Sequence, residues 1–305
     1  MKVAVIGHVE WVQFARVEAV PRRGEVVHAE DPFEEPAGGG AVAAVQLARL
    51  AGSCSLYTAL GGDGTGRAVL ARLAELGVQV QASSEHEPTR RAVTLIDAGN
   101  ERTIVTLGRR LEPRGEDERI GWGSLRELDA VYFTAGDRRA LELARANARV
   151  VVASPRARHA LGGGVPLDAL VLSADDEIEL REAQRALGEA ALVVYTEGSR
   201  GGRWVEQDGG EGRWDAVPAP APGAGAAAGA GGSDAHGGAG RDAVSARAGM
   251  SPPDSYGCGD SFAAGLTYAL GAGLGLDDAF ALAARCGAEC TGGRGPYERQ
   301  LHLKG

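Results

Sequence analysis

The sequence has few cysteines and no long apolar segment, and each absence excludes a class of protein. The four cysteines, Cys54, Cys258, Cys286 and Cys290, lack the spacing of a disulfide framework, which favours reduced thiols. No apolar run is as long as a membrane span. Residues 1–10 lack the apolar core and the small-residue cleavage site of a signal peptide. We therefore expect a cytoplasmic protein that does not enter a membrane.

An excess of positive charge is also absent. The 32 lysines and arginines are outnumbered by 41 aspartates and glutamates, which gives a net charge of −9. Because an acidic surface repels phosphate backbones, we do not expect nucleic acid or an anionic membrane as a partner. The 305 residues suffice for one large α/β domain with a sizeable core.

Short apolar runs alternate with helical segments along most of the chain. Glycine-bounded helical patterns occupy 38–52 and 64–78. The apolar runs lie at 2–7, 54–62, 129–136, 148–155, 168–174 and 190–198. Strands that alternate with helices are typical of a parallel sheet that is covered on both faces. The sequence therefore predicts an α/β fold with a mostly parallel central sheet flanked by helices.

Two segments do not follow this alternation. Residues 9–35 and 90–107 read as short strands and hairpins, the second around Gly99-Asn100, and we expect a small antiparallel β lid. Residues 217–253 are rich in Gly, Ala and Pro and predict a flexible insertion. We otherwise expect a single domain over 1–305. Exposed lid strands often pair with another subunit, so a homodimer through the lid is an open alternative.

A glycine turn enters an apolar helix in the stretch PPDSYGCGDSFAAGLTYAL, residues 252–270. A helix start has unpaired N–H groups and a partial positive charge, and glycines let the amides approach an anion closely. Asp260 at the edge of such a turn would repel a phosphate. It is explained either as a helix cap or as a base that takes a proton from a hydroxyl attacking phosphorus.

The same stretch resembles the C-terminal signature of the PfkB (ribokinase-like) carbohydrate kinase family, Asp-Thr-x-Gly-Ala-Gly-Asp-x-Phe. The matching residues are Asp254, Gly257, Gly259, Asp260 and Phe262, while Ser255 and Cys258 replace Thr and Ala. The resemblance extends over nearly the whole chain. The family's Gly-Gly motif with its helix, Gly-x-Asp-x-x-Gly stretch, lid hairpin and Thr-x-Gly-x-x-Gly loop follow in order at 36–52, 58–78, 89–105 and 193–202.

This resemblance implies a ribokinase-like fold and ATP-dependent phosphorylation of a hydroxyl with Mg²⁺. The substrate would be a small molecule, by default a sugar or sugar phosphate, with a nucleoside as an alternative. Asp260 would be the general base, and the amides of Gly257, Cys258 and Gly259 the anion hole. The implied nucleotide-binding residues are Thr196, Gly198, Gly201 and Asp254, and the implied substrate-binding glycines are Gly38 and Gly39.

The substrate side departs from the family pattern. Val12 stands near the position of the family's sugar-binding Asp, so Glu10 is the candidate replacement and Trp11 is a candidate to stack on a ring. Alternatively, both residues sit on a lid strand that faces solvent or a partner. Because hydroxyl recognition needs paired polar groups, we expect a pocket less polar than a ribose or fructose site.

The family's metal-side motif, Asn-x-x-Glu, also lacks its Asn here. The frame 174–177 keeps a glutamate, and the frame 173–176 keeps a hydroxyl and a carboxylate. We favour Glu177 as a water-mediated ligand of Mg²⁺. The alternative is an acidic helix start that the helix dipole stabilises.

Two further features have competing interpretations. GGDGTG at 61–66 also marks lipid and NAD kinases, but its place between a strand and a helix favours a structural turn. Cys258 lies at a helix start, where a thiol pKa tends to fall, or simply fills the place of an alanine. For the whole chain, the alternative to a kinase is a catalytically degenerate ribokinase-like protein that binds a nucleotide or metabolite.

Overall fold

A nine-stranded sheet forms the body of the protein in the computed structural model, which describes residues 1–219 and 254–303. In spatial order its strands are β13 (Glu211–Trp214), β12 (Gly202–Glu206), β11 (Ala190–Thr196), β10 (Leu167–Ser173), β9 (Ala148–Ala153), β8 (Leu128–Phe133), β1 (Val3–Ile6), β4 (Cys54–Gly61) and β5 (Val78–Glu85). All strand pairs from β11 to β5 are parallel, and β12 and β13 are antiparallel. The predicted mostly parallel sheet is confirmed.

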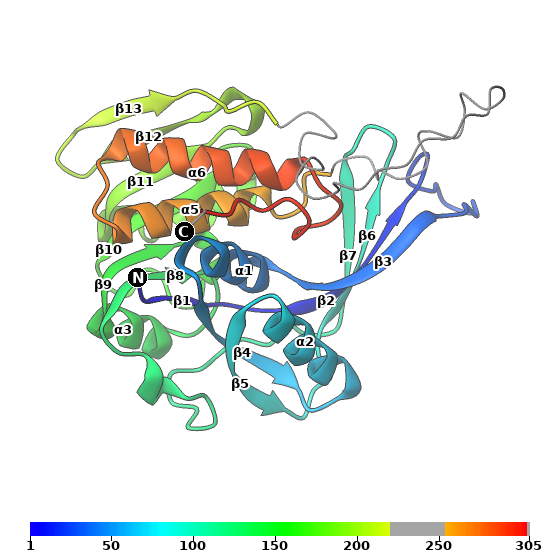
Figure 1. Ribbon diagram of the computed structural model, residues 1–305, viewed down its shortest axis with the longest axis horizontal. Coiled ribbons are helices and arrows are strands. Elements are labelled where there is room, and N and C mark those ends of the chain that lie inside the picture. The colour runs from blue at the N-terminus through cyan, green and yellow to red at the C-terminus, as the bar shows by residue number, and fades with distance from the viewer. Residues whose placement is uncertain (220–253, 304–305) are drawn as a thin grey trace, which may run out of the picture.

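Helices cover both faces of this sheet (Figure 1). On one face lie α1 (Gly39–Ala51), α2 (Gly64–Glu75), α5 (Cys258–Gly271) and α6 (Leu276–Thr291); on the other lie α3 (Arg138–Asn147) and α4 (Glu177–Ala183). The short 3-10 helices are η1 (Trp122–Ser124), η2 (Pro155–Ala157), η3 (Leu187–Glu189) and η4 (Gly198–Arg200). The sequence of strand β1 explains why both faces of the sheet are covered. Its side chains alternate, so that Val3 and Val5 join one hydrophobic core and Ala4 and Ile6 join the other.

A second sheet of four strands, here called the lid sheet, projects from the side of the body (Figure 1). Its order is β3 (Glu30–Ala37), β2 (Glu10–Arg16), β6 (Arg91–Ile96) and β7 (Arg102–Leu107). The expected small sheet is confirmed, with one difference: its central pair, β2 and β6, is parallel. The long connection between them, through α1, β4, α2 and β5, permits this pairing.

The predicted hairpin at Gly99-Asn100 joins β6 to β7, which pair antiparallel, and Asn100 adopts a left-handed φ of 61°. Strand β7 is exposed along its length, and the homodimer through the lid stays a prediction. Residues 220–253 of the predicted insertion 217–253 lie outside the described residues. Within 1–219 and 254–303, every helix is too short or too polar to span a bilayer.

The parallel strands all end at the same edge of the large sheet. Chain order runs one way from β1 through β4 to β5 and the other way from β8 through β9 to β10, so the order reverses between β1 and β8. In open α/β sheets, ligands bind outside the carboxyl ends of the strands at such a reversal. The segments that follow β1, β8, β9 and β10 are therefore the place to look for a site.

Candidate active site

Asp260 lies in the first turn of α5, directly after the glycine turn. Gly257 is the cap residue, with a left-handed φ of 82°, and no side chain caps this helix among the described residues. The carboxylate is half-buried, and burial raises its pKa. The charge of Arg156 opposes that rise, and the charge of Glu179 adds to it. Asp260 is therefore not the helix cap, and it is a stronger base than an exposed aspartate.

The two glycines at the start of α1 leave room beside Asp260. A Cβ added at Gly39 would lie 3.0 Å from Asp260 Oδ1 and 3.0 Å from Thr134 Oγ1. A Cβ added at Gly38 would lie 3.0 Å from His8 Nε2, and its φ of 86° also favours glycine. The structure thus brings the predicted substrate glycines to the predicted base, with the ends of β1 and β8 on either side.

Glu10 and His8 are buried next to these glycines, where β1 continues toward the lid sheet. Each is 7% exposed. Burial raises the pKa of Glu10, whose Oε2 lies 3.1 Å from Nε of Arg90. Burial, and then the charges of Arg110 and Arg156, lower the pKa of His8, so its imidazole is neutral at neutral pH. Glu10 therefore lies at the candidate site and not in solvent.

Trp11 is not brought to the site. Neighbouring residues of a strand point to opposite faces, and the indole N–H of Trp11 donates to Oε2 of Glu34 at 2.8 Å on β3. A role for Trp11 in stacking on a substrate ring has no support in this arrangement. The contrast with Glu10 follows from strand alternation alone.

Three arginines that the sequence did not single out, Arg90, Arg110 and Arg156, surround the same place. We call them the arginine cluster. Arg110 donates through Nη2 to the carbonyl of Thr134 at 3.0 Å and through Nη1 to the carbonyl of Arg156 at 3.3 Å. Arg156 donates through Nε to Glu179 at 2.6 Å. The surroundings of Glu10 and Asp260 are thus more highly charged than the sequence predicts, since Arg90 stands just before β6, Arg110 follows β7 and Arg156 is in η2.

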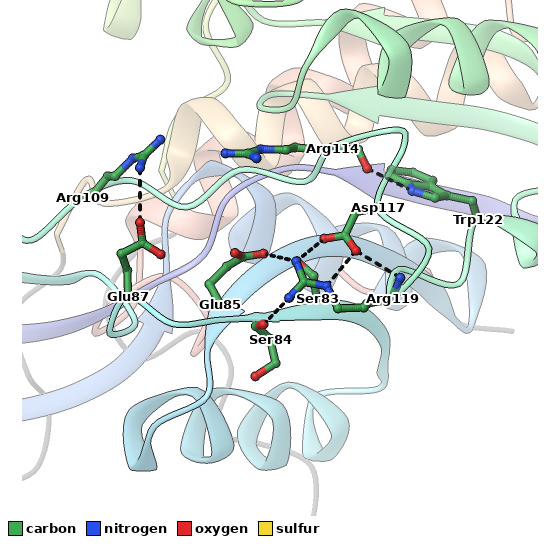
Figure 2. A network of polar contacts seen from close by, with 9 residues as sticks. All are labelled: Ser83, Ser84, Glu85, Glu87, Arg109, Arg114, Asp117, Arg119 and Trp122. Atoms are coloured by element: carbon green, nitrogen blue, oxygen red, sulfur yellow. Dashed lines mark hydrogen bonds and ion pairs between the residues drawn. The ribbon is translucent and has the colours of Figure 1, made fainter.

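The loop that carries Arg110 is fixed by a second set of charges (Figure 2). This loop leads from β7 to β8. Arg119 binds Asp117 at 2.7 Å, Glu85 at 2.9 Å and the carbonyl of Ser84 at 2.6 Å, and so fastens the loop to the end of β5. Arg109 pairs with Glu87 at 3.2 Å. These contacts hold the loop on both sides of Arg110, whose own side chain contacts Thr134 and Arg156 at the candidate site.

The predicted nucleotide residues lie at the end of β11. The hydroxyl of Thr196 donates to the carbonyl of Leu172 at 3.3 Å. Gly198 and Gly201 have φ of 59° and 83°, and an added Cβ at Gly201 would collide with the carbonyl of Trp214. The turn therefore requires glycine at position 201, and the positive φ favours glycine at position 198. Contact with a nucleotide stays a prediction for this loop.

In the glycine turn before α5, both carboxylate oxygens of Asp254 accept hydrogen bonds from the backbone. Its two oxygens accept from the amides of Tyr256 at 2.8 Å and Gly295 at 2.7 Å. Asp254 thus stabilises the turn, and its contact with a nucleotide stays a prediction.

The predicted anion hole lies in the same turn. Gly259 is exposed, and nothing lies within 4 Å of a Cβ added there. Burial raises the pKa of Cys258, which favours the interpretation of a small packing residue over that of a reactive thiol.

Most of the acidic residues at the start of α4 form hydrogen bonds or ion pairs within the protein, and one does not. Asp176 caps the helix, Asp175 pairs with Arg200, and the buried Glu179 binds both Arg156 and the amide of Ser173. Glu177 is exposed and has no hydrogen-bond or ion-pair partner within the described ranges. Sequence reasoning missed Glu179, although the spacing Asp176-x-x-Glu179 fits Asn-x-x-Glu with Asp in place of Asn.

The GGDGTG segment is a structural turn. Oδ1 of Asp63 accepts from the amide of Gly66 and the hydroxyl of Thr89, each at 2.8 Å, and Oδ2 accepts from the amide of Thr89 at 3.1 Å. Asp63 therefore caps α2 and fastens the segment that leads into the lid sheet. Although partial burial opposes it, these hydrogen bonds lower the pKa of Asp63.

Replacing Asp63 by Ala should lower the free energy of unfolding by about 1–3 kcal/mol, since a cap and two further hydrogen bonds are lost. Because the folded-state pKa is lowered, the stabilisation is present above the unfolded-state pKa and is lost as pH falls through the folded-state pKa. Urea unfolding at several pH values measures this effect. ATP affinity should change little; abolished ATP binding in a folded variant would instead support the lipid or NAD kinase interpretation.

Comparisons with known proteins agree with this arrangement. The model of the pfkB family carbohydrate kinases matches residues 1–158, just over half of the chain. A ribokinase of Dictyostelium discoideum is 28% identical over 108 residues, which cover 35% of this chain and 34% of that protein. The match thus spans about a third of the curated relative.

Solved structures share the fold over nearly the whole chain. A microbiome-derived acarbose kinase superposes with a TM-score of 0.73 and 20% identity, covering 99% of this chain and 96% of the other. A ribokinase of Arabidopsis thaliana, solved with ribose and ATP, superposes with a TM-score of 0.67 and 16% identity over 99% and 96% of the two chains. At these identities the structures establish the fold alone. Together with the family match, they show that this chain belongs to the pfkB family of carbohydrate kinases.

Proposed function

We propose that the protein is an ATP-dependent kinase that phosphorylates a hydroxyl of a small metabolite, a sugar or sugar derivative. The observation that carries this proposal is the position of Asp260. Its carboxylate stands at the start of α5 and closely approaches Gly39, which has no side chain to displace it, and burial raises its pKa. A binding protein has no need for a base at an anion-binding turn, whereas phosphoryl transfer to a hydroxyl does.

In the proposed reaction, Asp260 accepts the proton of the substrate hydroxyl as its oxygen attacks the γ-phosphorus of ATP, and ADP leaves. The amides of Gly257, Cys258 and Gly259 would stabilise the negative charge on the transferring group, because they lie at the positive end of the α5 dipole. Positioning and charge stabilisation account for most of the acceleration in such transfers. Thr196, Gly198 and Gly201 would flank the nucleotide.

The acidic start of α4 fits a magnesium ion that accompanies ATP. Mg²⁺ prefers carboxylate oxygens and keeps several waters, and Glu177, which is exposed and has no partner among the described residues, can accept from such waters. Glu179 is engaged with Arg156 and Ser173 and is the less available carboxylate. When bound with ATP, Mg²⁺ would neutralise part of the phosphate charge.

Release of ADP from ATP and Mg²⁺ tests the proposal, measured with the full chain across sugars, sugar phosphates, sugar acids and nucleosides. Turnover with one substrate class, together with a phosphorylated product seen by mass spectrometry, is the expected result. ATP binding without any product would contradict the proposal and favour the degenerate binding protein. A sample without acceptor controls for hydrolysis of ATP by water.

A further inference from the structure

Buried polar atoms without partners gather at the candidate site. Within 1–219 and 254–303, the buried side-chain atoms there that have no hydrogen-bond partner are His8 Nδ1, Glu10 Oε2, Arg90 Nε, Arg110 Nε and Thr134 Oγ1. Glu10 Oε2 and Arg90 Nε form an ion pair at 3.1 Å, and Arg110 Nε forms one with Glu112 at 3.1 Å, but neither ion pair is a hydrogen bond. Leaving buried polar atoms without a hydrogen bond costs free energy, and five of the ten such atoms in the described residues lie at this one place. The site is therefore built for a polar ligand.

The donors at this site outnumber the acceptors. Each guanidinium of the arginine cluster carries five N–H groups and accepts nothing. Their protein partners are the three carboxylates Glu10, Glu112 and Glu179 and the carbonyls of Thr134 and Arg156. Several guanidinium N–H groups remain for a ligand. A neutral hydroxyl donates as well as accepts, whereas a phosphate or carboxylate only accepts and binds guanidinium in a forked geometry.

The cluster also brings like charges together. Burial, and then the charges of Arg90 and Arg156, lower the pKa of Arg110, while Glu112 opposes them. The same three positive charges add to the effect of burial on His8. A bound anion would reduce this repulsion. The side chains of Arg90 and Arg110 are 17% and 21% exposed, so they are mostly shielded from bulk water.

We propose that the substrate carries an anionic group, a phosphate or a carboxylate, that the arginine cluster binds while Asp260 acts on a hydroxyl of the same molecule. This proposal rests on the proposed kinase function and narrows it to phosphorylated sugars and sugar acids. The two ends of the site fit such a molecule. His8 and Glu10, the partner of Arg90, lie against Gly38, and Thr134 and Asp260 lie against Gly39. Arg110 contacts the carbonyl of Thr134, and the charge of Arg156 acts on Asp260.

The test compares matched substrates, and it compares an arginine of the cluster with an arginine outside the site. Each sugar of a series is tested as the neutral sugar, as its terminal phosphate and as its acid. Turnover is measured with ATP and Mg²⁺, and binding is measured separately in the absence of nucleotide. At least one anionic member should exceed its neutral parent in kcat/KM by about 100-fold or more, and the phosphate and acid arms tell the two anions apart. Arg110→Gln should raise KM for that substrate by about 10- to 100-fold with a smaller change in kcat.

Arg185→Gln is the matched control, because Arg185, just beyond the end of α4, is exposed and pairs with Glu182, away from the loop that carries Arg110. It should leave KM unchanged. Arg110→Lys should restore part of the affinity by returning the charge. If Arg110→Gln does not fold, as judged by circular dichroism, Arg90→Gln provides the same comparison.

The outcomes separate this proposal from the kinase function. Two results would contradict the anionic substrate without contradicting the kinase function. One is a higher kcat/KM for a neutral sugar than for its anionic forms. The other is an equal loss of kcat/KM on neutral and anionic substrates in Arg110→Gln. Binding of an anionic sugar that is lost in Arg110→Gln, without phosphorylation of any compound, would support the anionic ligand and reject the kinase. If no anionic sugar binds or reacts, the arginine cluster is a structural ion-pair group and the proposal fails.

Discussion

Replacing Asp260 by Asn should lower kcat by about 100- to 10,000-fold, the range that a general base contributes. Asn keeps the size of the side chain and loses the proton acceptor, so substrate and ATP binding should be largely retained. The measurement is steady-state ADP release on the substrate that the panel identifies. Because the pKa of Asp260 is raised, kcat/KM of the unsubstituted protein should rise with pH as this carboxyl ionises, and the variant should lose that dependence.

The same variant should not be less stable. Since the folded state raises the pKa of Asp260, it binds the proton more tightly than the unfolded chain does. The contribution of this group to stability is therefore present below the unfolded-state pKa and is lost as pH rises through the folded-state pKa. At neutral pH the buried charge destabilises the fold, and Asn removes it. The thermal midpoint should stay equal or rise.

Asp278→Asn is the matched control, an exposed aspartate in the first turn of the neighbouring helix α6. It should keep full activity. A large fall in the thermal midpoint of Asp260→Asn would mean that the carboxylate holds the turn together, and the role of base would then have no support.

A methyl group at position 39 should abolish most of the activity without unfolding the protein. The added Cβ of Gly39→Ala would lie 3.0 Å from both Asp260 Oδ1 and Thr134 Oγ1, in the space where a substrate hydroxyl must reach the base. Displacing reacting groups by about 1 Å costs roughly 100-fold in rate. Gly39 is in the first turn of α1, and alanine is favoured over glycine in helices. Activity and thermal unfolding of the one variant report the two effects separately.

Gly40→Ala provides the contrast at the next residue. Its added Cβ would lie 2.6 Å from the carbonyl oxygen of His8 and 2.9 Å from the carbonyl carbon of Gly7. Backbone cannot move aside as a side chain can, so this variant should lose about 1–3 kcal/mol of stability. If Gly39→Ala retained normal turnover, the space beside Asp260 would not be the site of reaction.

Features that depend on neighbouring residues could be predicted from the sequence. The alternation of Val3, Ala4, Val5 and Ile6 into two cores made a covered parallel sheet the natural expectation. Asp260 stood out because its glycines and its helix are contiguous with it. The base and its turn thus needed no tertiary information.

Features that depend on strand order could not be predicted in this way. Arg90, Arg110 and Arg156 are 20 and 46 positions apart. Arg90 and Arg110 stand at the paired ends of β6 and β7, and the pairing of β2 with β6 and of β8 with β1 and β9 brings them to Arg156, which follows β9. A single arginine carries no local signal in a chain with 32 basic residues. The position of Trp11 has a simpler cause, since adjacent side chains of a strand point to opposite faces and Glu10 faces the site.

The seven parallel strands end at one edge of the large sheet, and this has a consequence for folding. Glu10 and Asp260 are 250 positions apart and yet close enough for their charges to interact. Each half of the chain can form its helices locally, but neither half contains the site. Closing such long loops carries an entropic cost that precedes any stabilising contact. The candidate site therefore forms only when the whole fold is complete. A partly folded chain would have no activity, even if most of its helices and strands had formed.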